Sequence, residues 1–166
     1  MGNSSIIRYA QLSPSNERIK YYANRGVSGI DGSLSTAAGI AHASENLTLA
    51  ITGDLGFLYD SNAMWNRKLP SNLRILVINN GGGGIFHILK GPSDQPGFKE
   101  YIEANHPVNL EKLAGAYGLD YLYAGKEAEL DRQWGTFLQE YPKKPATIAI
   151  CIVVLSRIFQ EQGRNY

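Results

Sequence analysis

Short apolar runs alternate with helix-like stretches along most of this chain. The clearest run, Leu73–Ile78, is continuous and rich in branched residues, and two asparagines follow it, which is typical of a buried strand. Similar runs predict further strands over residues 19–23, 47–52, 121–123 and 147–154. The helical spacing of apolar residues predicts helices over residues 33–44, 60–67, 110–117 and 127–141.

The alternation of strands and helices predicts how the chain folds. Strands separated by helices are typical of a parallel sheet with helices packed on both faces. The expected fold class is therefore α/β, with a three-layer doubly wound parallel sheet. At 166 residues the chain has the size of one ordinary domain. Residues 81–106 have no regular period and predict a long loop with at most one helical turn, and such loops are often functional.

Composition and charge narrow the class of protein. The 43% hydrophobic and 19% charged residues are typical of a globular domain. A net charge of +1 gives no electrostatic reason to expect nucleic acid or a membrane surface as a partner. The longest apolar run, residues 147–155, is too short for an integral membrane segment. The single cysteine, Cys151, excludes an intrachain disulfide and a Cys-based zinc site, and it fits a cytoplasmic protein.

Glycine is abundant and clustered. The chain has 18 glycines, against about 12 expected from average usage. Many of them lie at residues 26–32 and 81–84. Because glycine has no side chain, such clusters commonly allow the backbone to approach a ligand closely, so both segments are candidate ligand-binding loops.

Polar residues and glycines follow two of the predicted strands. Asp54 comes after strand 47–52 in a Gly-Asp-Leu-Gly sequence, and Asn80 comes after strand 73–78, directly before four glycines. Their separation suits one crossover, so a right-handed βαβ unit would bring both strand ends to the same edge of the sheet. A carboxylate, an amide oxygen and a glycine carbonyl are ligands that Mg²⁺ accepts beside phosphate. Glycine N–H groups suit phosphate oxygens, so the two motifs together predict a metal-bridged diphosphate.

Structural roles compete with this interpretation. Gly-Asp after a strand is also a common helix cap, and Asn-Gly is a common turn, so each motif alone favours a structural role. Their joint placement at two strand ends favours a site. A dinucleotide site is excluded because no G-x-G-x-x-G opens a helix after a strand, and a P-loop is excluded because no Gly-Lys-Ser/Thr follows the glycines.

The same motifs resemble a known family. Gly53-Asp54, with Asn79-Asn80 one crossover later, resembles the thiamine-diphosphate motif of the decarboxylase and acetolactate-synthase superfamily. More specifically, YANRGVSGIDGSLSTAAGIA, TGDLGFLYDSNAMW and INNGGGGIFHIL resemble the C-terminal domain of the carboligases of menaquinone biosynthesis, the 2-succinyl-5-enolpyruvyl-6-hydroxy-3-cyclohexene-1-carboxylate synthases. NLEKLAGAYGLDY looks like the helix and strand that follow in that family. The resemblance covers residues 3–148.

The resemblance implies a thiamine-diphosphate-binding fold, with thiamine diphosphate and Mg²⁺ (or Mn²⁺) as cofactors. The metal ligands would be the side chains of Asp54 and Asn80 and the carbonyl of Gly82. The backbone after strand 47–52 would bind the diphosphate, and the Ser-Gly-Ile turn before Asp31 would lie against the cofactor. The cofactor-binding residues implied by the family are Ser28, Gly29, Ile30, Gly53, Leu55, Gly56 and Asn79.

The reaction of the resembled family uses two substrates: 2-oxoglutarate is decarboxylated, and its succinyl unit is added to isochorismate. By resemblance, Arg25 would meet a substrate carboxylate, with a surface ion pair as the structural alternative. Ile85, Phe86 and Leu89 would line the isochorismate side of the pocket. The helical spacing of Phe86 and Leu89 is equally typical of core packing.

The resemblance also implies an incomplete enzyme. The family's catalytic glutamate lies in a separate N-terminal pyrimidine-binding domain, which no part of this chain resembles, and its active site forms between domains of two subunits. We therefore expect one domain over residues 1–166, part of a larger homodimeric or homotetrameric enzyme and inactive alone. Residues 149–166 stay apolar where the family turns polar, so they are poorly assigned and are a candidate surface for binding another copy.

Several residues and functions have a second interpretation. His87 lies beside the site without an evident orienting partner, and His42 and His106 are expected on a helix surface and in a loop. Asp31 is expected to cap the helix that begins near Ser33. The alternative functions are another thiamine-diphosphate decarboxylase of the superfamily, a non-catalytic phosphate- or nucleotide-binding module, and a structural fragment that binds no ligand.

Overall fold

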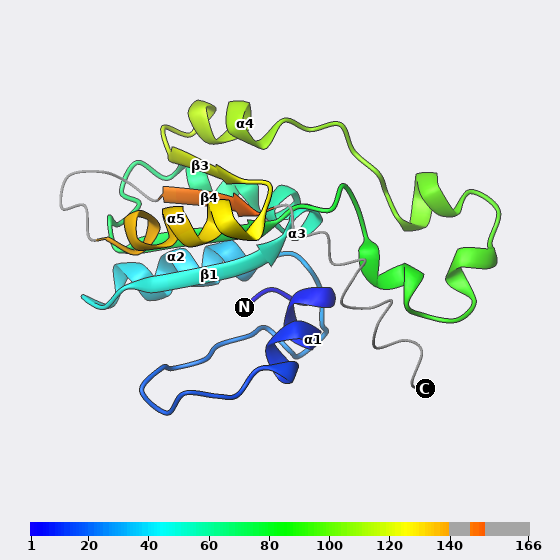
Figure 1. Cartoon of the computed structure of the whole chain (residues 1–166), viewed down its shortest axis with the longest axis horizontal. Helices are drawn as coiled ribbons and strands as arrows, with labels where there is room; N and C mark the ends of the chain where they lie inside the picture. The colour runs from blue at the N-terminus through cyan, green and yellow to red at the C-terminus, as the bar shows by residue number, and fades with distance from the viewer. Residues whose placement is uncertain (140–146, 152–166) are drawn as a thin grey trace.

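Four parallel strands form the centre of the fold (Figure 1). The computed structural model describes residues 1–139 and 147–151. Within these residues the strands are β1 (Thr48–Gly53), β2 (Leu73–Ile78), β3 (Asp120–Ala124) and β4 (Thr147–Cys151), in the spatial order β1-β2-β4-β3. Every neighbouring pair is parallel, which confirms the α/β fold class with a parallel sheet.

Helices connect these strands. In the described part of the chain the α-helices are α1 (Ser5–Leu12), α2 (Ser33–His42), α3 (Asp54–Tyr59), α4 (Leu110–Ala116) and α5 (Glu127–Leu138). The shorter 3-10 or π-helical turns are η1 (Ser61–Trp65), η2 (Gly84–His87), η3 (Pro92–Asp94) and η4 (Phe98–Ile102). α3 and η1 join β1 to β2. The turns η2, η3 and η4 and then α4 join β2 to β3, and α5 lies between β3 and β4. The chain thus follows the strand–helix–strand order that the sequence predicts.

Successive residues of β2 pack on opposite faces of the sheet. Ile75 lies in an apolar cluster with Leu34 of α2 and Ala114 of α4, whereas Leu76 lies in a second cluster with Phe137 of α5. The connection from β3 back to β4 reverses direction along the sheet. A right-handed crossover that runs in the reverse direction carries its helix on the opposite face, which explains why α5 packs apart from α2 and α4.

β1 and β2 end side by side. Their pairing runs from Thr48 beside Leu73 to Gly53 beside Ile78. Because both strands run in the same direction, the segments that follow them leave the sheet at the same edge. The sequence-based expectation that the two polar motifs meet at one edge of the sheet is therefore confirmed.

Most of the other predicted elements are confirmed with small shifts at their ends. Helix 33–44 is α2, helix 110–117 is α4, and strands 47–52 and 121–123 are β1 and β3. Helix 127–141 is α5, which ends earlier than predicted, at Leu138. The predicted end of strand 147–154 lies outside the described residues, as does most of the apolar segment 149–166. The strand that the sequence shows most clearly, β2, has the predicted bounds.

Residues 19–23 and 81–106 differ from the prediction. The first segment forms no strand: Tyr22 is 51% exposed, and no strand of the described sheet pairs with this segment. The second segment contains three helical turns, η2, η3 and η4, rather than at most one. Gly91 and Gly97 directly precede η3 and η4 with φ of 103° and 72°. Glycine adopts these left-handed conformations at little cost, so the two residues separate the turns.

Asp60 accounts for two further differences. Its buried carboxylate accepts hydrogen bonds from the backbone N and the Oγ of Ser35, at 2.7 and 2.6 Å. Asp60 lies between α3 and η1, at the start of the predicted helix 60–67, which forms only the shorter 3-10 turn η1. The same bonds provide an acceptor for a backbone N–H in the first turn of α2, and that acceptor comes from another part of the chain. The prediction that Asp31 caps this helix is wrong. Gly32 occupies the N-cap position of α2, and no N-cap side chain donates or accepts a capping hydrogen bond there.

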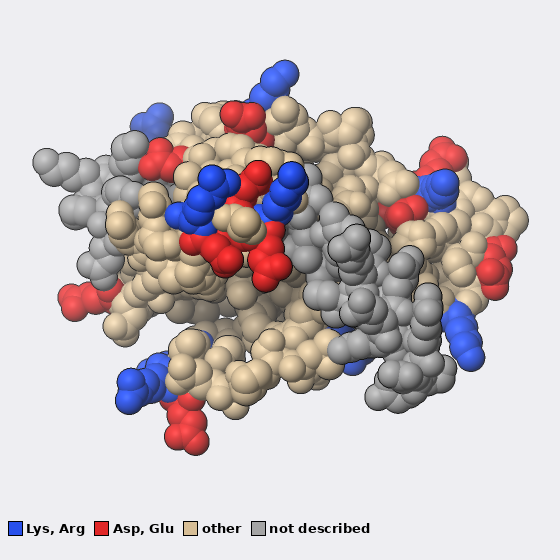
Figure 2. Space-filling model, viewed as in Figure 1, with Lys and Arg blue, Asp and Glu red and all other residues tan. Residues whose placement is uncertain are grey.

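Charged side chains of both signs lie among one another on the surface over α5 (Figure 2). The helix itself carries three acidic residues and one arginine, Glu127, Glu129, Asp131 and Arg132. Mixed charges of this kind produce no extended field of one sign over that face. Within the described residues, no helix is both long enough and apolar enough to cross a bilayer.

Candidate functional site

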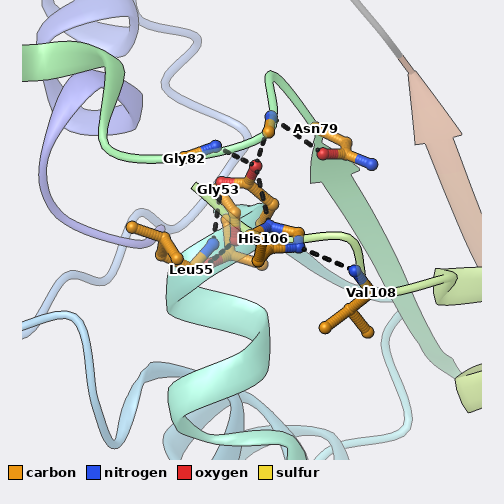
Figure 3. Close-up of polar contacts among 9 residues, drawn as sticks. Gly53, Leu55, Asn79, Gly82, His106 and Val108 are labelled. Carbon is orange, nitrogen blue, oxygen red and sulfur yellow. Dashed lines mark hydrogen bonds and ion pairs between the residues drawn. The ribbon is translucent and has the colours of Figure 1, made fainter. Parts of the chain in front are cut away.

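The carboxylate of Asp54 is the most buried charged group at the edge where β1 and β2 end. Asp54 is the first residue of α3 and is only 2% exposed. Its Oδ1 accepts a hydrogen bond from the N–H of Leu55 at 2.7 Å, and its Oδ2 accepts from the N–H groups of Gly81 and Gly82 at 2.7 and 2.9 Å. In Figure 3 the dashed lines from Leu55 and Gly82 mark two of these bonds. One side chain thus joins the segments that follow β1 and β2.

Asn79 and Asn80 have different surroundings in the loop after β2. The Oδ1 of Asn79 accepts a hydrogen bond from the N–H of Gly81 at 3.1 Å, so this side chain holds the glycine loop (Figure 3). Asn80 is exposed and lies against Gly84. The N–H of Gly83 donates to the carbonyl of Glu103 at 2.6 Å. The loop is therefore fixed both to the segment that follows β1 and to the far end of the segment 84–102.

A pocket of about 880 Å³ opens at this edge of the sheet. Its wall comes from four separate parts of the chain, residues 3–9, 25–30, 52–56 and 78–89, together with Glu103. The structure brings the predicted site residues together around it, with Asn79 as the exception: Arg25, Ser28, Gly29, Ile30, Gly53, Asp54, Leu55, Gly56, Asn80, Gly82, Ile85, Phe86 and Leu89. Their individual roles stay predictions.

The backbone at Gly56 comes close to the turn that contains Ile30. A Cβ at Gly56 would lie 2.6 Å from the Oγ1 of Thr52 and 3.4 Å from the carbonyl oxygen of Ile30. A side chain at this position would clash with the Oγ1 of Thr52, so either that hydroxyl or the start of α3 would have to move. Glycine at this position therefore lets the first turn of α3 and the turn 28–30 share one wall of the pocket.

Residues 3–9 form a wall of the pocket that the sequence interpretation missed. Ser4, Arg8 and Tyr9 line the pocket, and the last two come from α1, which no prediction included. Ile6 of the same helix is 4% exposed and anchors it. Burial raises the pKa of Tyr9 above its usual value, while a hydrogen bond with Ser5 acts in the opposite direction. The apolar spacing of SIIRYAQL was an available signal for this helix.

His106 is a second residue that pattern analysis underestimated. It lies in a loop, as predicted, but its Nε2 is 3.3 Å from the Oδ2 of Asp54, and its side chain is 11% exposed. Its Nδ1 accepts a hydrogen bond from the N–H of Val108 at 3.3 Å (Figure 3). Because 52 positions separate His106 from Asp54, no local motif could indicate the contact.

His87 has an orienting partner, contrary to the sequence-based expectation. Its Nε2 lies 2.6 Å from the Oε1 of Glu103, and its ring stands edge-on to Phe98 with centroids 5.0 Å apart. His87 and Glu103 both line the pocket. The partner was not evident because it comes from the other end of the segment 84–102, which folds back on itself.

Comparison with known proteins identifies the family. Residues 1–150 match the model described as thiamine pyrophosphate enzyme, C-terminal TPP binding domain. Curated relatives named 2-succinyl-5-enolpyruvyl-6-hydroxy-3-cyclohexene-1-carboxylate synthase include one from Desulfotalea psychrophila, 54% identical over 73% of this chain and 22% of the relative. One from Christiangramia forsetii is 48% identical over 86% of this chain and 25% of the relative. One from Bacteroides thetaiotaomicron is 45% identical over 99% of this chain and 28% of the relative.

This chain spans about a quarter of the length of those relatives. The matched family model covers both strand-end motifs, the glycine loop and the pocket that they surround. The chain therefore belongs to the family of C-terminal, thiamine-pyrophosphate-binding domains of thiamine pyrophosphate enzymes.

Proposed function

We propose that this chain is the diphosphate- and metal-binding part of a 2-succinyl-5-enolpyruvyl-6-hydroxy-3-cyclohexene-1-carboxylate synthase. Such an enzyme decarboxylates 2-oxoglutarate and adds the succinyl unit to isochorismate. The observation that carries the proposal is the buried carboxylate of Asp54, which joins the segments after β1 and β2 at the wall of one pocket. The curated relatives that bear this name support the choice of reaction.

The residues at the pocket fit a magnesium or manganese ion. Asp54, Asn80 and Gly82 all line the pocket, and they offer one carboxylate, one amide oxygen and one backbone carbonyl. These are hard oxygen donors with a single full charge, the set that suits Mg²⁺ when phosphate and water supply the other ligands. We assign the metal to these three residues.

The backbone around the start of α3 fits a diphosphate. Gly53, Leu55 and Gly56 line the pocket where α3 begins, and N–H groups at a helix start favour anions. Ser28, Gly29 and Ile30 face the same pocket and would hold the rest of the cofactor. Asn79 lies outside the pocket lining, so we assign it the support of the glycine loop rather than a contact with the cofactor.

Bound thiamine diphosphate would supply the electron sink for decarboxylation, and the chain would supply orientation and electrostatics. Arg25 and Arg8 both line the pocket and would offer positive charge to the carboxylates of the substrates. Ile85, Phe86 and Leu89 line its apolar part, and they would exclude water around the ring of isochorismate.

The finer fold and the assembly also belong to this proposal. Apolar clusters on both faces of the sheet support a three-layer, doubly wound arrangement. The relatives are much longer than this chain, which leaves room for the N-terminal pyrimidine-binding domain and its catalytic glutamate. The complete enzyme would be a homodimer or homotetramer, and this chain alone would be inactive.

The first test measures metal binding without turnover. A chimera is made in which this chain replaces the matching quarter of the Bacteroides thetaiotaomicron relative. The EPR signal of free Mn²⁺ is then titrated with the chimera in the presence of thiamine diphosphate. Asp54→Asn keeps the size of the side chain and removes its charge, so we expect the affinity for Mn²⁺ to fall at least about tenfold. Asp94→Asn, at an exposed aspartate outside the pocket, is the matched control.

The second test identifies the reaction. Consumption of 2-oxoglutarate is measured with and without isochorismate, and we expect the coupled product only when both substrates are present. Release of CO₂ without consumption of isochorismate would favour another decarboxylase of the superfamily. Equal binding of Mn²⁺ with ATP, FMN or thiamine diphosphate would favour a general phosphate-binding module.

A further inference from the structure

The side chain of Asn3 bridges two parts of the pocket wall. It is 3% exposed, and its Nδ2 donates hydrogen bonds to the carbonyl oxygens of Asn24 and Gly29, at 2.8 and 2.6 Å. Its Oδ1 accepts a hydrogen bond from Nη1 of Arg25 at 2.7 Å. Both amide protons and the amide oxygen are thus used. No other type of side chain of this size supplies two donors and an acceptor in this arrangement.

The backbone that carries Asn3 is fixed to the edge of the sheet. The N–H of Gly2 donates to the carbonyl of Ile51 in β1 at 2.7 Å. A Cβ at Gly2 would lie 3.1 Å from the Oγ1 of Thr52, so the backbone at Gly2 packs closely on β1. Ile6, in the first turn of α1, is buried and anchors the helix that follows Asn3. Asn3 is consequently held at a constant place relative to the end of β1, where Asp54 begins α3.

Among the contacts of the described residues, the guanidinium of Arg25 has a hydrogen bond with Asn3 alone. Arg25 is exposed, and a free arginine side chain loses substantial rotamer entropy when it binds a ligand. The bond to Asn3 restricts its guanidinium before any ligand arrives. The bond to Gly29 holds the turn 28–30, in which Ser28 has a φ of 56°. A single amide therefore restricts both a cation and a turn that line the same pocket.

We propose that Asn3 is a positioning residue that orients Arg25 for the carboxylate of a substrate and fixes the turn 28–30 beside it. The proposal rests on the carboxylate-binding role of Arg25 in the proposed function. Asn3 touches no substrate itself in this scheme; it acts through the guanidinium and through the carbonyl of Gly29.

The test is a double-mutant cycle in the chimera. The KM for 2-oxoglutarate, the KM for isochorismate and kcat are measured for Arg25→Ala, Asn3→Ala and the double variant. We expect Arg25→Ala to raise the KM of one substrate, and Asn3→Ala to raise the same KM by roughly tenfold, as for a lost hydrogen bond to a charged group. The double variant should raise this KM by clearly less than the product of the two single changes, because both residues act on the carboxylate through one guanidinium and only the bond to Gly29 is left for Asn3 to contribute separately.

A second variant of Asn3 tests the effect of charge beside Arg25. Asn3→Asp keeps the size of the side chain but removes the two donors and places a negative charge beside Arg25. We expect it to raise the same KM at least as much as Asn3→Ala, because the new carboxylate neutralises the cation that the substrate needs. A milder effect than that of alanine would contradict the proposal.

Asn72 offers a matched structural control. Its Nδ2 donates to the carbonyls of Ala41, Ser44 and Asn46 at 3.0, 2.7 and 2.9 Å, and it lies outside the pocket lining. Asn72→Ala removes a comparable amide clamp, so it should lower the Tm and leave both KM values unchanged. Equal changes in KM for the Asn3 and Asn72 variants would overturn the proposal, since they would reflect stability alone.

The remaining outcomes separate the two hypotheses. If Arg25→Ala raises a KM and Asn3→Ala does not, the role of Asn3 is wrong and the proposed function stands. If Arg25→Ala changes neither KM, the carboxylate-binding role of Arg25 is wrong, and the positioning role of Asn3 falls with it. An additive double variant would also overturn the proposal, because it would show that Asn3 acts independently of Arg25.

Discussion

Nε2 of His106 lies 3.3 Å from Oδ2 of Asp54, although 52 positions separate the two residues. The N–H of Val108 donates to Nδ1 of the same ring, which leaves the proton on Nε2 and directs it at the carboxylate. The contact joins the end of the segment 81–106 to the start of α3. It also supplies a side-chain donor to an oxygen that otherwise receives backbone N–H groups from Gly81 and Gly82.

Replacement of His106 should weaken metal binding more than it weakens the fold. In the chimera, His106→Ala removes the donor that orients Asp54, and we expect the affinity for Mn²⁺ to fall about tenfold, as for other groups that orient a metal ligand. His106→Gln keeps a donor at a similar reach and should retain most of the affinity. The measurement is the EPR titration with thiamine diphosphate present. His42→Ala, at an exposed histidine of α2, is the control, and an affinity equal to that of this control would contradict the role.

Two glycine-to-alanine variants should change the stability of the isolated chain in opposite directions. At Gly82 a Cβ would lie 2.6 Å from Oδ1 of Asn105 and 2.8 Å from the carbonyl oxygen of Glu103. That carbonyl is held by the N–H of Gly83, so Gly82→Ala should cost roughly 1–3 kcal/mol of unfolding free energy. At Gly39, in the exposed part of α2, an added methyl group would meet no atom within 4 Å beyond its chain neighbours and the backbone of its own helix. Gly39→Ala should therefore stabilise by about 0.5–1 kcal/mol. Urea denaturation measures both, and a loss of stability in both variants would count against the local explanation.

Arg74 is a buried cation that holds the end of α5 against β2. It is 0% exposed, and its Nε donates to the carbonyl of Phe137 at 2.6 Å, while Nη2 donates to the carbonyl of Gln139. Its Nη1 donates to the carbonyl of Ser71 at 2.6 Å. One guanidinium thus satisfies carbonyl groups at the C-terminus of a helix, where acceptors lack partners within the helix.

Removal of that guanidinium should destabilise the fold. Arg74→Met keeps much of the apolar stem and leaves the carbonyls without their donors, so we expect a loss of roughly 2–4 kcal/mol in urea denaturation. Arg74→Lys keeps the charge without the planar fork and should fall between the Met variant and the parent chain. Arg132→Met, at an exposed arginine of α5, should change stability by less than about 0.5 kcal/mol. If the Arg74 and Arg132 variants lost equal stability, the proposed role of the buried fork would be wrong.

Tyr121 should make the fold sensitive to alkaline pH. Burial raises its pKa above the usual 10.0, and the negative charge of Glu111 raises it further. The folded protein therefore favours the neutral phenol. This contribution to stability is present at pH values below 10 and is lost as the pH rises through the raised pKa. Tyr121→Phe should reduce the decline in the urea midpoint at alkaline pH, whereas Tyr101→Phe, at a residue that is 76% exposed, should not. An unchanged alkaline decline in the Tyr121 variant would refute the expectation.

Local patterns were sufficient for the elements that define the sheet edge. The continuous apolar run Leu73–Ile78 predicted a buried strand, and the strand has the same bounds in the structure. The meeting of Asp54 with the glycine loop followed from parallel pairing alone, because neighbouring parallel strands end at one edge. The motifs at 25–30 and 85–89 came from family resemblance, and the structure brings them to the same pocket.

Contacts between distant segments could not be read from local patterns. Asp60 caps α2 from 25 positions away, and His106 reaches Asp54 across 52. Each of these partners is chosen by the tertiary fold, so neither leaves a spacing in the sequence. The predicted strand at 19–23 was wrong for a related reason. Its residues have strand-like composition, but in the described sheet no neighbouring strand pairs with them. Asn3 was missed because an isolated asparagine carries no motif.

The hydrogen bond from Gly83 to the carbonyl of Glu103 closes the segment between them at its base. Three short helical turns lie in the segment 84–102, and the first part of this segment carries the apolar residues that line the pocket. Insertions, deletions or substitutions within the segment 84–102 can therefore leave the positions of the glycine loop and Asp54 unchanged. Under the proposed function, the side of the wall assigned to the acceptor could thus be altered without moving the side assigned to the metal and the diphosphate.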